Sequence, residues 1–156
     1  MAKRKQKLRI CLAASAGGHV SQLLKLASSW EGHETVCIVT TDVVRNRLAE
    51  LGRVYVVGEC NHRYPLRVMK VLLRCIRAIL REYPDVLIST GAAVGCIACF
   101  LGKLIGAKVI WIESIANVEG LSLSGKMVRP IANLFIVQWP QIAEQYSNVE
   151  YLGALI

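Results

Sequence analysis

Short apolar segments alternate along this chain with segments in which apolar residues recur at helical spacing. The predicted strands cover residues 8–14, 35–40, 53–57, 85–89, 108–113, 134–138 and 149–152. The predicted helices cover 20–30, 42–51, 65–83, 92–105, 125–132 (interrupted by Pro130) and 140–146, and residues 114–124 are expected to form a loop. Strands that are apolar throughout are typical of a parallel sheet buried on both faces. The sequence therefore predicts an α/β fold: one Rossmann-like domain over residues 1–156, with a doubly wound parallel sheet.

The composition agrees with one well-packed domain. Hydrophobic residues make up 54% of the 156 residues, which excludes a disordered chain. No apolar run reaches the roughly 18 residues that suggest a membrane span, and the run at 10–14 is too short for a signal peptide. We therefore expect a cytoplasmic protein with reduced thiols. Cys96 and Cys99 form a CxxC pair inside an apolar helix, where core packing is expected rather than a redox or zinc site.

The positive charge is concentrated in two places. The chain carries 19 Lys and Arg against 11 Asp and Glu, a net charge of +8. Residues 3–9 and 63–81 contain 11 of the 19 basic residues and no acidic ones. A local basic surface predicts an anionic partner.

A glycine-rich turn separates the first predicted strand from the first predicted helix. It contains Gly17, Gly18 and His19. Glycines allow a ligand close to the backbone, and a helix N-terminus offers N–H groups to an anion. His19 could contact a diphosphate or act as a general base. The alternative is a tight turn with a solvated capping histidine.

A second turn of the same kind follows the fourth predicted strand at Thr90 and Gly91. Glu113 and Ser114 end the fifth predicted strand. In a doubly wound sheet, ligands bind at the carboxyl ends of the strands, so we expect these residues to share one edge with His19. The alternative for Glu113 is a solvated strand end.

The predicted helix over 65–83 has an unusual distribution of charge. At about 100° per residue, its basic residues fall on one narrow arc and apolar residues fill most of the remaining circumference. This arrangement favours a helix that packs on the sheet and also lies in a bilayer interface. A core helix with a solvated basic edge is the main alternative, and no recognition motif supports nucleic-acid binding. The basic residues on the arc are Arg67, Lys70, Arg74, Arg77 and Arg81.

Several motifs, in order along the chain, resemble a known family. They are SAGGH at 15–19 followed by Leu23-Leu24, ISTGA at 88–92, WIES at 111–114 followed by SGK at 124–126, FIVQW at 135–139 and YLG at 151–153. The series resembles the PssD-type polysaccharide biosynthesis proteins of bacteria. These are similar to the membrane-anchor subunit (asparagine-linked glycosylation protein fourteen) of the eukaryotic dolichol-linked N-acetylglucosaminyltransferase.

The resemblance implies the N-terminal half of a GT-B glycosyltransferase of the MurG type, divided between two polypeptides. In that scheme this chain binds the membrane and a polyprenyl-diphosphate-linked sugar acceptor. A separate subunit, the C-terminal half, binds most of the nucleotide diphosphate sugar donor. The implied process is exopolysaccharide or capsule synthesis, with the protein peripheral on the inner face of the plasma membrane. No cofactor, metal or nucleic acid is expected.

The resemblance also suggests roles for single residues. His19 and Glu113 are the catalytic candidates. Asn117 stands where the family pattern commonly has an arginine, and the basic tail at 3–9 stands where eukaryotic relatives have a transmembrane anchor, so anchoring here would be peripheral. The alternative function is a non-catalytic scaffold that only recruits a catalytic partner to the membrane. The candidates for acceptor binding are Gly17, Gly18, Thr90, Gly91, Ser114 and Asn117, and those for membrane binding are the five basic residues on the helical arc.

Overall fold

A seven-stranded parallel sheet forms the centre of the protein. The computed structural model describes residues 7–60, 63–153 and 155, so the predicted basic tail at 3–9 lies partly outside the described residues. The strands are β1 (Arg9–Ala14), β2 (Glu34–Val39), β3 (Gly52–Val56), β4 (Val86–Ser89), β5 (Lys108–Ile112), β6 (Leu134–Val137) and β7 (Glu150–Tyr151). Each predicted strand is present, with ends that differ by at most one residue.

The strand order reverses between β1 and β4. The order in the sheet is β3-β2-β1-β4-β5-β6-β7, and every neighbouring pair is parallel. From β1 the chain builds outward to β3, then crosses back to β4 and builds outward to β7 on the other side. This topology confirms the predicted doubly wound fold. It also creates a switch point at the carboxyl ends of β1 and β4, where ligands of such sheets bind.

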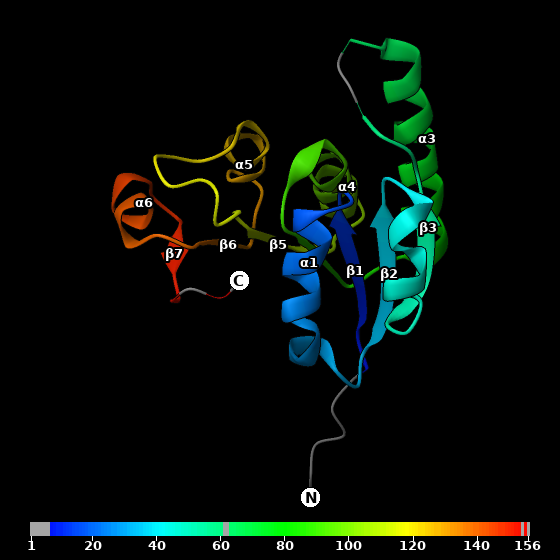
Figure 1. The fold of residues 1–156 in the computed structure, drawn as a ribbon, viewed down its shortest axis with the longest axis horizontal. Coiled ribbons are helices and arrows are strands. Elements are labelled where there is room, and N and C mark those ends of the chain that lie inside the picture. Colours follow the sequence, from blue (N-terminus) through cyan, green and yellow to red (C-terminus); the bar gives the residue numbers. More distant parts are fainter. Residues whose placement is uncertain (1–6, 61–62, 154, 156) are drawn as a thin grey trace, which may run out of the picture.

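Helices cover both faces of the sheet (Figure 1). One face packs against residues of α3, α4, α5 and α6, and the other packs against α1, η1, η2 and α2. Side chains along β1 point alternately to the two faces and so contribute to the hydrophobic core on each: Leu12 faces the α1 side and Cys11 faces the α3 side. The helices are α1 (Gly18–Lys25), α2 (Arg45–Leu48), α3 (Pro65–Glu82), α4 (Ala92–Leu104), α5 (Leu123–Val128) and α6 (Pro140–Gln145), with 3-10 turns η1 (Ala27–Trp30) and η2 (Asp42–Val44).

Three predicted helices differ from the structure by more than one residue. The segment 20–30 divides into α1 and η1, where Ser28 and Ser29 are poor helix formers, and 42–51 divides into η2 and α2. Helix α5 begins earlier than expected because the Ser122 hydroxyl caps it, accepting from the Gly125 N–H at 2.9 Å. It ends at Val128, two residues before Pro130, which has no N–H with which to continue the helical hydrogen bonds.

The cysteines are free thiols, and all but Cys60 are buried. Burial raises the pKa of Cys37 and of Cys75 to about 12, so these thiols stay protonated near neutral pH. Cys96 and Cys99 both lie in the core on α4, which confirms the prediction that this CxxC pair packs in the core. Within the described part of the chain, no helix is long and apolar enough to span a membrane.

Candidate functional site at the switch point

His19 is held against the turn that follows β4. Its Nδ1 lies 2.8 Å from the carbonyl oxygen of Thr90, and the Thr90 hydroxyl donates to the carbonyl oxygen of His19, also at 2.8 Å. Because a carbonyl oxygen only accepts, Nδ1 carries the proton in the neutral ring. Nε2 then has a free lone pair and can accept a proton. The pairing therefore leaves Nε2, rather than Nδ1, as the nitrogen that can act as a general base.

Gly91 makes room for the His19 ring. A Cβ at position 91 would lie 2.5 Å from Cε1 and 2.9 Å from Nδ1 of His19. Gly91 has a φ of +136°, and Ala92, the first residue of α4, has a φ of +67°. Positive φ at a non-glycine residue stores strain, which is often found at functional sites. The switch-point turn is therefore shaped around the imidazole.

The glycines before α1 leave open space beside His19. Gly17 and Gly18 are exposed, and a Cβ on either would meet no atom within 4 Å. Thr40, directly after β2, accepts a hydrogen bond from the Ala16 N–H at 3.0 Å and so fixes the start of the turn. Helices α1 and α4 thus both begin at this edge, next to the His19–Thr90 contact. Their N-termini can bind an anionic group such as a diphosphate.

Glu113 is buried, so the alternative of a solvated strand end is wrong. Its carboxylate accepts four hydrogen bonds. Oε2 accepts from Trp111 Nε1 and Ser122 Oγ, each at 3.2 Å. Oε1 accepts from the Ser114 N–H at 3.3 Å and from the Asn117 side-chain amide. A Cβ on Gly125 would lie 2.0 Å from Oε2, so the start of α5 packs tightly against the carboxylate. Glu113 therefore organises the segment from β5 to α5.

Ser114 is linked to α1 through a residue that the sequence reasoning missed. Gln22 Nε2 donates to Ser114 Oγ at 3.2 Å. Gln22 lies three residues after His19 on the same face of α1, and this spacing could have identified it. The structure thus brings His19, Thr90 and Gly91 into direct contact and connects Ser114 to them through α1. Asn117 instead contacts Glu113.

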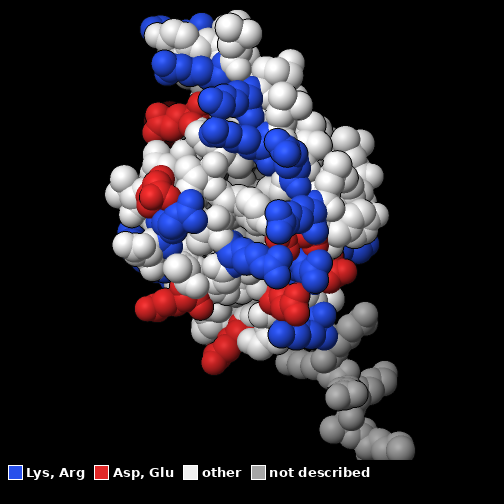
Figure 2. Space-filling model, turned by 90° about the vertical axis from the view of Figure 1, so that its right-hand side faces the viewer, with Lys and Arg blue, Asp and Glu red and all other residues white. Residues whose placement is uncertain are grey.

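The predicted membrane-binding residues lie away from this turn, along α3. All five basic residues of the arc are exposed and form part of a continuous basic band on one face of the molecule (Figure 2). Beside them on the helix surface are Leu66, Met69, Leu73 and Leu80, whose side chains are 54–86% exposed. Helix α3 therefore presents two adjacent exposed stripes, one basic and one apolar, while Val71, Cys75, Ala78 and Ile79 pack into the core.

The C-terminal end of α3 is fixed to the sheet by a buried carboxylate. Glu82 accepts hydrogen bonds from Arg53 at 2.9 and 3.2 Å and from the Tyr55 hydroxyl. Burial by itself raises the pKa of Glu82, but the hydrogen bonds from Tyr55 and Arg53 and the charge of Arg53 outweigh burial and lower it. Glu82 is therefore ionised at neutral pH and ties α3 to β3.

A sequence model described as "Oligosaccharide biosynthesis protein Alg14 like" matches residues 39–155. The UDP-N-acetylglucosamine transferase subunit ALG14 of Candida albicans is 31% identical, with 99% of this chain and 83% of that protein covered. The mouse protein of the same name is 28% identical, with 97% and 85% covered. These matches confirm the resemblance to asparagine-linked glycosylation protein fourteen.

Solved structures show the same fold at low identity. Acinetobacter baumannii MurG superposes with a TM-score of 0.76 at 17% identity, covering 94% of this chain and 46% of that one. The UDP-N-acetylglucosamine 2-epimerase of Rickettsia bellii gives a TM-score of 0.72 at 13% identity, covering 96% and 45%. The chain therefore spans less than half the length of these structures. Together, the sequence matches and the Rossmann-like fold show that the chain belongs to the Alg14 family and is a glycosyltransferase subunit.

Proposed function

We propose that this subunit binds the lipid-linked acceptor for a two-chain glycosyltransferase and supplies its general base. A partner subunit, the C-terminal half, binds the nucleotide sugar. The relatives are named as subunits of a UDP-N-acetylglucosamine transferase, which supports UDP-N-acetylglucosamine as the donor. The observation that carries the proposal is the His19–Thr90 pairing at the switch point, which leaves Nε2 free to accept a proton.

The chemistry follows from this arrangement. His19 Nε2 takes the proton of an acceptor hydroxyl while the hydroxyl oxygen forms a bond to the anomeric carbon of the donor sugar. The bond from that carbon to the donor diphosphate breaks, and the nucleoside diphosphate leaves with the bonding electrons. The N-termini of α1 and α4, with open space at Gly17 and Gly18, bind the diphosphate of a polyprenyl-linked sugar. Ser114, which Gln22 of α1 contacts, also binds the acceptor, while Glu113 and Asn117 position the loop that follows β5.

The proposal includes peripheral attachment to the inner face of the plasma membrane through α3. An exposed apolar stripe next to a basic stripe suits the boundary between acyl chains and anionic headgroups. The resemblance to bacterial polysaccharide proteins supports a role in exopolysaccharide or capsule synthesis.

Transfer activity of the complex tests the base. The chain is purified with the partner that supplies the C-terminal half, and sugar transfer from UDP-N-acetylglucosamine to a membrane lipid extract is measured. His19→Ala should reduce kcat by about 100-fold or more, the usual contribution of a general base. His33→Ala is the matched control, because His33 lies at the amino end of β2, away from the switch point. There its Nδ1 accepts a hydrogen bond from the Leu8 N–H at 3.2 Å. Full activity of His19→Ala would instead identify a scaffold.

A further inference from the structure

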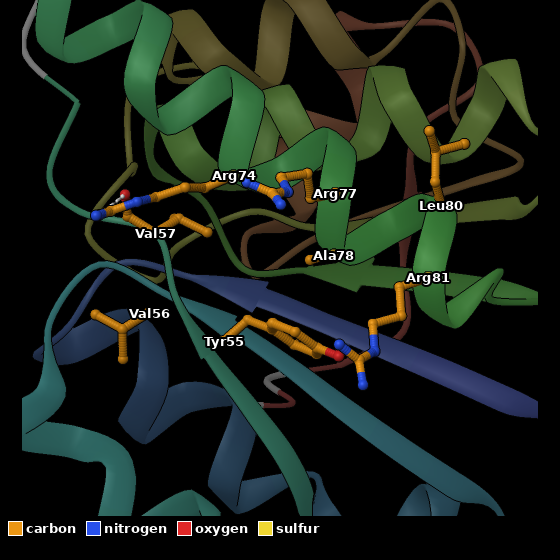
Figure 3. Close-up of a pocket in the computed structure, with 8 residues that line it drawn as sticks. All are labelled: Tyr55, Val56, Val57, Arg74, Arg77, Ala78, Leu80 and Arg81. Atoms are coloured by element: carbon orange, nitrogen blue, oxygen red, sulfur yellow. Dashed lines mark hydrogen bonds between the residues drawn. The ribbon is translucent and has the colours of Figure 1, made fainter.

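Three arginines of α3 line one pocket at the open edge of the sheet. Arg74, Arg77 and Arg81 extend from successive turns of the helix toward the end of β3 (Figure 3). The pocket has a volume of about 720 Å³ and is completed by Tyr55, Val56, Val57, Ala78 and Leu80. It lies apart from the His19 turn and has no role in the chemistry described above.

The arginines are available to a ligand. The four ion pairs found among the described residues involve none of the three. Arg74 Nη1 donates to the Val57 carbonyl oxygen at 3.1 Å, which fixes this side chain on one wall of the pocket. Figure 3 shows the Arg81 guanidinium beside the phenol of Tyr55. The nearby carboxylate of Glu82 is already held by Arg53 and Tyr55. Within the described part of the chain, three guanidinium groups therefore face one cavity without an anionic partner.

We infer that this pocket binds the phosphomonoester headgroup of a membrane lipid. One guanidinium group can bind two phosphate oxygens at once. A phosphomonoester has more unesterified oxygens and more negative charge than a phosphodiester, so it can be shared among three arginines. The exposed apolar stripe of α3 ends beside the pocket at Leu80, so an acyl chain can lie along it while the headgroup enters. This continuity favours a lipid over a soluble phosphate. The inference rests on the proposed membrane role of α3 and adds headgroup selectivity to it.

Vesicle binding tests the selectivity. Binding of the full chain is measured by flotation with phosphatidylcholine vesicles that contain either phosphatidic acid or phosphatidylglycerol, adjusted to the same zeta potential. We expect about tenfold tighter binding to phosphatidic acid, as a charge-assisted phosphate site would give. The double variant Arg77→Gln/Arg81→Gln should lose this preference. Its matched control is Arg67→Gln/Lys70→Gln, which removes the same charge from the same helix outside the pocket. This control should weaken binding to the two kinds of vesicle by the same factor.

The outcomes separate the two proposals. Equal binding of the wild type to both vesicles would overturn the headgroup pocket and leave the membrane role of α3 intact. Loss of the preference in both double variants would also overturn it. Failure of the folded wild type to bind either vesicle would contradict the membrane role itself. Glycerol 3-phosphate is tested by calorimetry and as a competitor. If it bound as tightly as the phosphatidic acid vesicles, the ligand would be a soluble phosphomonoester rather than a lipid.

Discussion

His19 and Thr90 are joined by two hydrogen bonds, although 71 positions separate them in the sequence: the imidazole donates to the Thr90 carbonyl oxygen, and the Thr90 hydroxyl donates to the His19 carbonyl oxygen. The pairing connects the turn after β1 to the turn after β4, which are the two strands at the switch point of the sheet. The fold therefore determines the tautomer of His19. The topology of the sheet is in this way linked to the proposed role of His19 as a base.

Gly91→Ala should displace His19 and lower activity. The new Cβ would lie 2.5 Å from Cε1 of the ring, and the φ of +136° is unfavourable for alanine. We expect a loss of about 2 kcal/mol in the free energy of unfolding, from strain of this kind. In a His19→Ala background the loss should be smaller, because the clash is gone and only the backbone strain remains. Thermal denaturation of the four proteins of this double-mutant cycle measures the coupling. Additive effects would show that the ring does not pack on Gly91 in solution.

Gly18→Ala should lower activity without lowering stability. Gly18 lies in the first turn of α1, lacks a positive φ and has open space where a Cβ would be. Alanine is the better helix former, so the free energy of unfolding should stay unchanged or rise by up to about 1 kcal/mol. The methyl group would nevertheless hinder close approach of the acceptor diphosphate. Gly17→Ala is the comparison: its φ of +90° predicts destabilisation as well. A fully active Gly18→Ala complex would remove this turn from the acceptor site.

Much of the fold could be predicted from residue patterns, whereas the detailed roles of site residues could not. Strands such as 85–89 were predicted because burial on both faces requires continuous apolar residues. The role of Glu113 could not be predicted, since two of its partners, Asn117 and Ser122, come from a loop without periodicity. Likewise, periodicity predicted the basic arc of α3, but the pocket also needs Tyr55, which β3 brings next to the helix.

Glu113→Gln should mainly destabilise the segment between β5 and α5. All four groups that contact the carboxylate donate hydrogen bonds, so an amide nitrogen in place of either oxygen would face two donors. A buried donor left unsatisfied costs about 2 kcal/mol. Denaturant unfolding gives the total, and hydrogen exchange across 114–122 locates it. Glu144→Gln, at an exposed position, should change neither. Unchanged stability with a collapse in kcat would instead make Glu113 a catalytic residue.

The contribution of Glu82 to stability should depend on pH. Its pKa in the folded state lies below its ordinary value, so the folded state favours the ionised form. Its stabilising effect is therefore fully present above the unfolded-state pKa, about 4.3, and is lost as the pH falls through the folded-state pKa. The difference in free energy of unfolding between wild type and Glu82→Gln should shrink as the pH is lowered from 6 to 3. Tyr55→Phe removes one hydrogen bond that lowers the folded-state pKa, so the pH-dependent loss should be smaller and should be complete at higher pH. A pH-independent difference would contradict the assignment.

Removal of the basic stripe on α3 should release the protein from anionic membranes. Each Lys or Arg close to such a surface contributes about 1 kcal/mol to binding, and salt screens this attraction at distances beyond a Debye length. Replacing Arg67, Lys70, Arg74 and Arg77 by Gln should therefore abolish salt-sensitive cosedimentation with phosphatidylglycerol vesicles, while circular dichroism shows an unchanged fold.

A control variant lacks four exposed charges elsewhere, at Lys25, Arg47, Lys108 and Lys126, and should still bind these vesicles. Leu66→Ser and Leu73→Ser together should weaken binding at every salt concentration, because they shorten the apolar stripe rather than the charged one. If the four-Gln protein cosedimented as wild type does, the stripe would be only a solvated face, and the acceptor would have to reach the His19 turn by another route.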